Sequence, residues 1–516
     1  MTSYDEIPYD SHAFPGTHPD QMALMARLFS VDTAPVSNCR VLELGCAAGG
    51  NLVPMAHSLP GSTFVGLDLS ERQIADGQAM IDALGVSNVR LEARDVLSID
   101  KSFGTFDYII CHGVYSWVPP AVQEKILAVC SENLAENGLA YVSYNTLPGW
   151  HLRGTVRDMM QYHAARFTDS AKRIEQSRAL LDFLIGALPE DGSAYSRLLH
   201  DELHIIKDRA DNYLFHEHLE DHNEPLYFNE FARRAGKSGL RFLSENYLSQ
   251  MVPNQFSPEV GQTLSDIASD LTHMEQYMDF LRGRMFRCSL LCHETVEPNR
   301  VVTRDRLMDC FAAAPLMPES GGDTFETTPA AVFIHGTDSR ITVGPALQQA
   351  ALWTLGRHWP AQFEVSDLAQ RARALTGGEA SDDSDREQVA DILLEALSGD
   401  LVEMRLAPQR FCVDVSAQPK GCALARHMAQ DSYKVTNRRH ETVFLNSVGR
   451  QTLKLLDGHR NHEDIAAGLC ELVRQGEMTI QRGDANITDE GEVRETVDEA
   501  LGKVLEELAR RALLVA

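Results

Sequence analysis

The sequence has no apolar run that approaches the length of a membrane span, and its first twenty residues are polar and contain proline. We therefore expect neither a transmembrane helix nor a signal peptide. The ten cysteines are scattered without paired spacing, and Cys39, Cys46 and Cys111 fall in or at the ends of expected strands. This distribution is typical of reduced thiols in a cytoplasmic protein rather than of a disulfide framework.

Basic residues are also scarce. Lys and Arg total 47 against 74 Asp and Glu, which gives a formal net charge of −27. Such an acidic surface argues against nucleic acid or an anionic membrane as the main partner, and it favours a basic substrate such as a lysine-bearing protein. With 516 residues, of which 44% are hydrophobic, the chain is long enough for three or four globular domains.

One stretch, residues 40–51, organises the first third of the chain. An apolar strand runs into a loop of small residues, and a helix begins at about Asn51. Small residues let the backbone approach a ligand, and the start of a helix offers unpaired N–H groups. Asp68 follows at the end of the next expected strand. This arrangement is how a doubly wound sheet binds a nucleoside and its ribose hydroxyls.

Strands and helices alternate through this region, which predicts an α/β fold with a parallel sheet. We expect strands at residues 40–44, 64–68, 88–92, 106–111 and 139–144, and helices at residues 51–58, 71–84 and 119–134. A further helix is expected to begin at Pro19. The segment before it carries Tyr4 and Tyr9, and it either folds over the bound ligand or packs as a simple strap.

The loop alone does not separate a dinucleotide from S-adenosylmethionine, and three features favour the latter. Glu43 would repel a pyrophosphate but attract the cationic amino-acid end of S-adenosylmethionine. Asp95, after the third strand, suits the exocyclic amine of adenine. The fourth strand ends in His112, with Tyr115 and Trp117 close behind, which places aromatic side chains at the ligand edge of the sheet.

Residues 40–144 resemble a class I S-adenosylmethionine-dependent methyltransferase. More narrowly, the chain is similar to the rickettsial-type protein lysine methyltransferases, in which a class I domain precedes a methyltransferase regulatory domain. The segments that carry this resemblance are 4–9, 17–19, 43–51, 111–119, 143–150, 216–220, 223–228, 239–240, 276–280 and 284–287. The resemblance implies S-adenosylmethionine as cofactor and a homodimer as the assembly.

The resemblance also implies residue roles. Gly45, Cys46 and Gly49 would line the methionine part of the cofactor, with Glu43 near its ammonium group. Asp68 would accept from the ribose hydroxyls, and Asp95 and Val96 would hold the adenine. The rest of the implied cofactor-binding set is Tyr4, Asn51, Leu69 and His112. The implied catalytic set is His112, Tyr115, Tyr9 and Trp117.

Two local features qualify this picture. Ala47 stands where many class I enzymes have glycine, so the loop is expected to be slightly less tight. No Asn/Asp-Pro-Pro-Tyr/Phe run follows the fourth strand, which argues against methylation of a planar base or a glutamine amide.

A lysine nucleophile must lose its proton, because its ordinary pKa is about 10.4. We expect an aromatic, partly dry channel formed by Tyr4, Tyr9, Tyr115, Trp117, Tyr144 and Trp150. Trp150 is the member of this set for which a core position is the favoured interpretation. His112 is a hypothetical proton acceptor, and a hydrogen-bonded core histidine is the alternative interpretation.

Residues 151–300 are expected to be mainly helical, and to cover the ligand edge of the sheet or form a dimer interface. His200 and His204 lie one turn apart, as do His218 and His222, but neither pair belongs to a His-Glu-x-x-His site, so no metal is expected.

After residue 299 a weak internal duplication indicates two small strand-and-helix units of winged-helix size. Residues 341–343 and 351–355 parallel residues 443–445 and 452–456. Neither unit carries a basic recognition run, so recognition of a protein substrate or scaffolding is the expected role. The predicted domains are 1–165 (class I methyltransferase), 166–300 (helical, regulatory or dimerising), 301–420 and 421–516 (both winged-helix-like).

The sequence therefore predicts a methyltransferase that acts on a protein nitrogen, most simply that of lysine. Two alternatives stay open. One is an N- or O-methyltransferase that acts on a small molecule or peptide metabolite, and the other is a cofactor-binding regulator without turnover.

Overall fold

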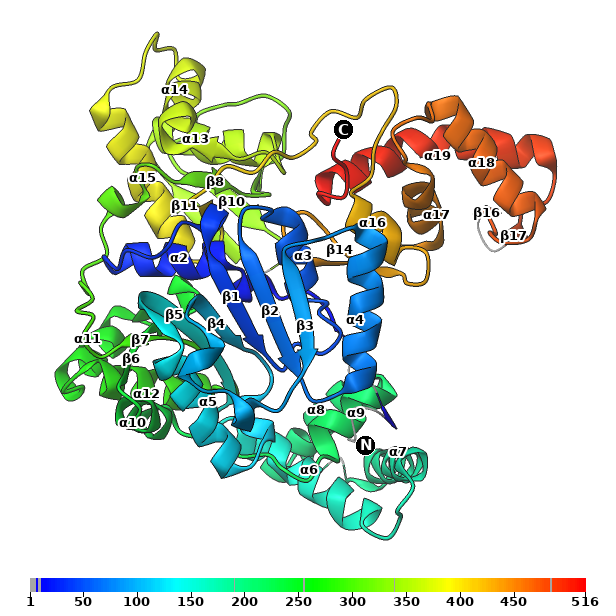
Figure 1. Ribbon diagram of the computed structural model, residues 1–516. Coiled ribbons are helices and arrows are strands. Elements are labelled where there is room, and N and C mark those ends of the chain that lie inside the picture. The colour runs from blue at the N-terminus through cyan, green and yellow to red at the C-terminus, as the bar shows by residue number, and fades with distance from the viewer. Residues whose placement is uncertain (1–5, 8–10, 190, 254–255, 338, 483–484) are drawn as a thin grey trace.

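Seven strands form one sheet in the order β3-β2-β1-β4-β5-β7-β6 (Figure 1). The computed structural model describes residues 6–7, 11–189, 191–253, 256–337, 339–482 and 485–516. The strands are β1 (Arg40–Leu44), β2 (Thr63–Asp68), β3 (Val89–Ala93), β4 (Phe106–Cys111), β5 (Leu134–Asn145), β6 (Leu240–Glu245) and β7 (Phe286–His293). Strands β1 to β5 pair in parallel, whereas β7 pairs antiparallel with both β5 and β6. The five predicted strands are confirmed, and β5 begins earlier than expected.

Residues 151–300 are mainly helical, as expected, but they also contain the strands β6 and β7, which the sequence analysis did not predict. These strands were missed because their buried positions include polar side chains. Ser244 and Glu245 in β6, and Arg287 and Ser289 in β7, are all fully buried. These residues interrupt the apolar alternation by which a strand is recognised. The sheet therefore extends well beyond the predicted boundary at residue 165.

Helices cover both faces of the sheet. Val41 points to the face covered by α2, α3 and α4, whereas Leu42 and Leu44 point to the face covered by α5 and α10. This alternation is the two-residue period of a strand buried on both sides. The bounds are α2 (Pro19–Leu28), α3 (Leu52–Ser58), α4 (Glu71–Leu84), α5 (Pro120–Glu132) and α10 (Phe228–Lys237). The helix predicted to begin at Pro19 is confirmed.

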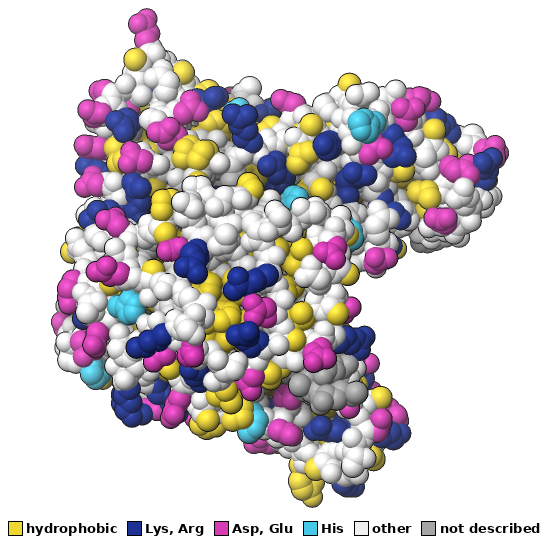
Figure 2. Space-filling view, viewed as in Figure 1, with side chains coloured by type: hydrophobic (Ala, Val, Ile, Leu, Met, Phe, Trp, Pro, Cys, Tyr) yellow, Lys and Arg dark blue, Asp and Glu magenta, His cyan; other side chains and the backbone are white. Residues whose placement is uncertain are grey.

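Four helices form a separate insertion between β5 and α10, with a core of their own that includes Met160, Leu203 and Phe215. They are α6 (Trp150–Ala164), α7 (Ser170–Ala187), α8 (Ala194–Lys207) and α9 (Asp211–His218). Helices α11 (Pro258–Ile267) and α12 (Leu271–Arg282) connect β6 to β7. The insertion and the C-terminal unit project beyond the sheet and leave a wide notch beside α4 (Figure 2).

A buried ion cluster ties α12 to the last two strands. The guanidinium of Arg287 is fully buried and bonds Glu245 of β6 at 2.6 Å, with Glu275 at 2.9 Å and Asp279 at 2.8 Å on α12. It also lies 4.0 Å from the ring centre of Phe228 on α10. Because a buried charge needs such partners, the cluster fixes the register of these elements.

The remaining chain forms two small α+β units. The middle unit has β8 (Phe311–Ala313), β9 (Met317–Pro318), β10 (Ala331–His335), β11 (Ser339–Val343), α13 (Ala346–Arg357), β12 (Phe363–Glu364), α14 (Val365–Leu375), α15 (Asp383–Ser398) and β13 (Glu403–Arg405). The C-terminal unit has α16 (Ala423–Met428), β14 (Lys434–Thr436), β15 (Thr442–Phe444), α17 (Ser447–Leu455), α18 (His462–Arg474), β16 (Gln481–Arg482), β17 (Ala485–Asn486) and α19 (Glu490–Arg510).

The two units differ in how they join the sheet. The core of the middle unit is continuous with the face of the sheet that α2 and α3 cover, whereas the C-terminal unit has its own core. Among the described helices, none is long and apolar enough to cross a bilayer. All ten cysteines are free thiols.

Candidate active site

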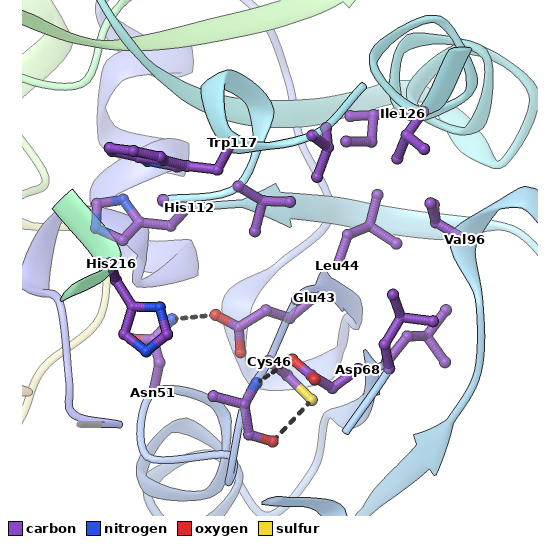
Figure 3. Close-up of a pocket in the computed structure, with 18 of the residues that line it drawn as sticks. Glu43, Leu44, Cys46, Asn51, Asp68, Val96, His112, Trp117, Ile126 and His216 are labelled. Atoms are coloured by element: carbon purple, nitrogen blue, oxygen red, sulfur yellow. Dashed lines mark hydrogen bonds between the residues drawn. The ribbon is translucent and has the colours of Figure 1, made fainter. Parts of the chain in front are cut away.

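A cavity of about 440 Å³ lies at the carboxyl ends of β1, β2 and β4, the ligand edge of such a sheet (Figure 3). Its size is that of an ordinary small-molecule site. The predicted residues that line it are Glu43, Gly45, Cys46, Asn51, Asp68, Leu69, Asp95, Val96, His112 and Trp117. Trp150, for which a core position was favoured, is buried and also lines the cavity.

The loop after β1 is folded tightly against β2. The N–H groups of Gly45 and Cys46 both donate to the carbonyl of Leu67, at 2.8 and 2.9 Å. Gly45 has φ +75°, and a Cβ there would lie 2.4 Å from the side chain of Val114. Ala47 adopts the left-handed region with φ 48°, and its N–H donates to Asp68 at 2.9 Å. The loop therefore keeps a glycine-like path in spite of Ala47.

Glu43 places a carboxylate at the end of β1, inside the cavity. Its Oε1 accepts a hydrogen bond from Nδ2 of Asn51 at 2.7 Å (Figure 3). Its Oε2 is buried and has no hydrogen-bond partner among the described residues. Burial raises the pKa of Glu43 to about 7. A buried acceptor without a partner is costly, so this oxygen fits a site for a cationic ligand group.

A second part of the cavity is formed by the ends of β2 and β3 and the turns after them. Asp68 ends β2, and Leu69 beside it has an exposed fraction of 59%. Oδ1 of Asp95 accepts from the N–H of Leu97 at 2.9 Å, which fixes the turn that also presents Val96. Carboxylates flanked by apolar side chains suit a ribose and a flat base.

Residues 11–14 cross over the loop and form one wall. Ser11 accepts a hydrogen bond from the N–H of Gly50 at 2.7 Å, and a Cβ on Gly50 would lie 2.4 Å from the Ser11 backbone. The N–H of Phe14 donates to Oδ1 of Asn51 at 3.0 Å. Tyr4 and Tyr9 lie outside the described residues, so their predicted roles stay predictions.

His112 stands at the end of β4, between this wall and the sheet. Its Nδ1 lies 3.0 Å from the hydroxyl of Tyr141, and the ring centres of His112 and Phe14 are 4.0 Å apart. Burial lowers the pKa of His112 to about 4. The imidazole is therefore neutral at physiological pH, and it is a weak base.

The aromatic part of the cavity comes from the turn after β4 and from the helical insertion. The rings of Trp117 and Trp150 meet edge to face at 6.1 Å. Arg157 lies 5.8 Å from the ring centre of Trp117, and Arg153 lies 5.4 Å from that of Trp150. Glu217 of α9 also lines the cavity, and burial raises its pKa.

The sequence analysis missed several lining residues as members of the site: Ser11, His12, Phe14, Arg153, His216 and Glu217. The segment 216–220 was noted for its resemblance, but a local pattern does not tell which side of a helix faces a cavity formed by a distant loop. Conversely, the structure does not bring Gly49, Tyr115 or Tyr144 to the cavity.

Tyr115 and Tyr144 correct the predicted channel. Both are fully buried, and both pack against Phe231 of α10, with ring centres 5.5 and 4.0 Å away. The turn after β4 directs Tyr115 into the core, so its side chain does not line the cavity. Gly49 has φ +71°, and a Cβ there would lie 3.0 Å from the side chains of Leu91 and Val53, on the side of the loop away from the cavity.

The rings of His200 and His204, one of the two histidine pairs considered as metal ligands, are stacked with their centres 6.1 Å apart. Within the ranges that the structure describes, no three His, Cys, Asp or Glu side chains are grouped as metal ligands.

The sheet order, the loop after β1 and the acidic ends of β1 and β2 define a class I S-adenosylmethionine-dependent methyltransferase. Comparison with known proteins agrees. Residues 35–201 match the methyltransferase domain family, 210–293 the predicted methyltransferase regulatory domain, and 417–513 the C-terminal winged helix domain of the PKMTs.

The structure of PKMT2 from Rickettsia typhi in complex with AdoHcy is similar over 99% of this chain and 100% of that one, with 30% identity and a TM-score of 0.88. An uncharacterised protein of Rickettsia prowazekii is 34% identical over 520 residues, which span 99% of this chain and 93% of that protein. A second one is 41% identical over 241 residues, 47% of this chain and 96% of that protein. The chain belongs to the family of the rickettsial protein lysine methyltransferases.

Proposed function

We propose that the protein transfers the methyl group of S-adenosylmethionine to the ε-nitrogen of lysine in a protein substrate. The observation that carries this proposal is the lining of the cavity. It includes the buried carboxylate of Glu43, and its acceptor end, as we name the part lined by Trp117, Trp150 and Glu217, is aromatic. The carboxylate of Glu217 can accept a proton from an entering lysine, and the cations Arg153 and Arg157 beside it favour the neutral amine.

The residues present fit the cofactor. Oε2 of Glu43 would accept from its ammonium group, and Asp68 would accept from the ribose hydroxyls. Leu69 and Val96 would flank the adenine, with Asp95 at its amine. The backbone of Gly45 and Cys46 would lie along the methionine part, since a side chain on Gly45 would meet Val114. When bound, the cofactor supplies a methyl group on a sulfonium, which is an activated electrophile.

The protein then has to position and deprotonate the lysine. Positioning alone supplies much of the acceleration in such a transfer. Glu217 is the better proton acceptor of the candidates, because burial raises its pKa while the pKa of His112 is lowered to about 4. We propose that His112 borders the methyl group and, with Trp117, orients the nucleophile. Aromatic surroundings favour the neutral amine by desolvation.

The test is incubation of the protein with methyl-labelled cofactor and host-cell extract. Label in protein that appears as methyl-lysine after hydrolysis is the expected result. Label only in the small-molecule fraction, or in another amino acid, contradicts the proposal. The same assay with Glu43→Gln, which leaves the acceptor end intact, serves as the control for labelling that does not depend on this cavity.

We also propose a cytoplasmic homodimer. The free thiols support a reducing compartment. Tyr162 on α6 and Phe183 on α7 have exposed fractions of 82% and 66%, which supports a covered face on the helical insertion. Light scattering of the purified protein tests this, and a monomeric mass at micromolar concentration contradicts the dimer.

A further inference from the structure

We propose that the turn Asn437–Glu441 of the C-terminal unit is a working part of the cofactor site, with His440 as its positioning residue. The proposal rests on the assignment of the cavity to the cofactor, and it does not depend on lysine as the acceptor. It gives the C-terminal unit a role in cofactor affinity, beside any role in substrate recognition.

The central observation is a contact across 389 residues of sequence. Nε2 of His440 lies 2.8 Å from Oδ1 of Asn51, and both side chains are buried. Asn51 in turn holds Glu43, whose second oxygen is left for the ligand. His440 is thus two hydrogen bonds away from the carboxylate proposed to bind the ammonium of the cofactor.

The donors and acceptors around Asn51 fix the direction of this chain of bonds. The N–H of Phe14 donates to Oδ1 of Asn51, so this oxygen is the acceptor atom. Nδ2 of Asn51 then donates to Glu43 at 2.7 Å and to the hydroxyl of Thr17 at 2.9 Å. His440 must therefore donate through Nε2–H, which keeps the Asn51 amide from flipping and turning its oxygen toward Glu43.

The conformation of the turn places the side chain of His440 against Asn51. His440 has φ 64°, a left-handed conformation that costs a non-glycine residue about 1–2 kcal/mol. Oδ1 of Asn437 accepts from the N–H groups of Arg439 and Glu441, both at 2.9 Å. The buried guanidinium of Arg439 lies 4.1 Å from the ring centre of Trp359 in the middle unit. A strained residue held by such surroundings is a mark of a functional position.

The same hairpin also supports the N-terminal wall of the cavity. Lys434 of β14 lies 3.2 Å from Nδ1 of His12, and the hydroxyl of Thr442 of β15 donates to the carbonyl of Ala13 at 3.3 Å. Figure 1 shows β14 beside α3, the helix that follows the cofactor loop. The wall and the Asn51 amide are therefore both held from the C-terminal unit.

The test uses the full-length protein and titration calorimetry with S-adenosylhomocysteine. His440→Phe keeps a ring but removes the donor, and we expect cofactor affinity to fall about tenfold, the value of one buried hydrogen bond. His440→Gln places an amide N–H near the position of Nε2, and we expect it to recover most of the affinity. The control is His459→Ala, an exposed histidine of the same unit, with unchanged affinity expected.

Two further measurements separate positioning from general damage. In an Asn51→Ala background the substitution His440→Phe should have no further effect, because the path to Glu43 is already broken. At saturating cofactor the turnover of His440→Phe should stay within about twofold of wild type, since its loss lies in cofactor binding. Wild-type affinity in His440→Phe, or equal losses in the Phe and Gln variants, would overturn the proposal, whereas absence of binding by the wild type would instead remove the cofactor assignment.

Discussion

The side-chain amide of Asn51 donates to Oε1 of Glu43 at 2.7 Å, and it leaves Oε2 of the same carboxylate buried without a partner among the described residues. This asymmetry leads to the first prediction. In the ligand-free protein burial raises the pKa of Glu43 to about 7, so below that pH the carboxylate holds a proton. Binding of an ammonium group requires the ionised form, and the proton must then be released.

Cofactor affinity should therefore increase as the pH rises from 6 to 8, by up to about tenfold per unit below pH 7 and little above it. Calorimetric titration at a series of pH values measures this. Glu43→Gln should bind more weakly and lose this pH dependence. An unchanged slope in the Gln variant would show that another group titrates.

The substitution His112→Ala should keep cofactor affinity but lower turnover about 100-fold, the usual cost of misplacing the reacting groups. Because the pKa of His112 is lowered to about 4, its ionisation should not appear in the activity profile between pH 6 and 9. Steady-state kinetics and calorimetry on the same preparation measure both quantities. Unchanged turnover would remove His112 from the mechanism.

Glu217→Gln should lower turnover on protein substrate while cofactor affinity stays within about twofold. Glu217 is the proposed proton acceptor at the acceptor end, so its loss should weaken deprotonation of the lysine rather than binding of the cofactor. Asp201→Asn on α8 is the matched control, since that carboxylate belongs to the same helical insertion but is exposed. Equal activity of the two variants would exclude Glu217 as the proton acceptor.

Arg287→Met should destabilise the fold by about 3–5 kcal/mol, because it removes the cation that Glu245, Glu275 and Asp279 share. Arg284, which lies 3.3 Å from Asp279, remains as the second cation of the cluster. Arg233→Met removes an exposed pair with Glu230 and should cost less than about 1 kcal/mol. Thermal and denaturant unfolding followed by circular dichroism compare the two. A small effect of Arg287→Met would mean that the carboxylates take up protons or water without a loss of folding stability.

Stability of the cluster should also depend on pH. Burial raises the pKa of Glu275 to about 7 from an ordinary value near 4.5. A raised acid pKa in the fold stabilises the protein at low pH, and this contribution is lost as the pH rises from about 4.5 to 7. Glu275→Gln should therefore flatten the decline in stability over this interval, and a decline of unchanged slope would assign it to other groups.

The sequence predicted the parts of the fold that local patterns encode. The strand at Arg40–Leu44, the small-residue loop and Asp68 belong to one contiguous unit, so their meeting at one sheet edge follows from the βαβ topology. The comparisons confirm the family assignment, and the similar PKMT2 of Rickettsia typhi binds AdoHcy. The predicted roles of Gly45, Cys46 and Asp95 stay proposals, although all three line the cavity.

What the sequence did not predict depends on distant partners. Strand β7 lacks a regular apolar pattern because two of its buried residues, Arg287 and Ser289, are polar. Both bond to Glu245, within the ion cluster that α12 completes. The direction of Tyr115 is set by a turn that places its ring against Phe231. Glu217 reaches the cavity only because α6 to α9 fold back over the sheet. None of these relationships leaves a periodic signal in its own segment.

The pairing of β5 with β7 has a consequence for how this protein can be divided. A fragment that ends after the methyltransferase family match at residue 201 would leave β5, a strand of 12 residues, as an open edge. Long open edges recruit other chains and aggregate. The two family matches at 35–201 and 210–293 therefore describe one inseparable folding unit. Shortened versions for assay or crystallisation should retain every residue through His293.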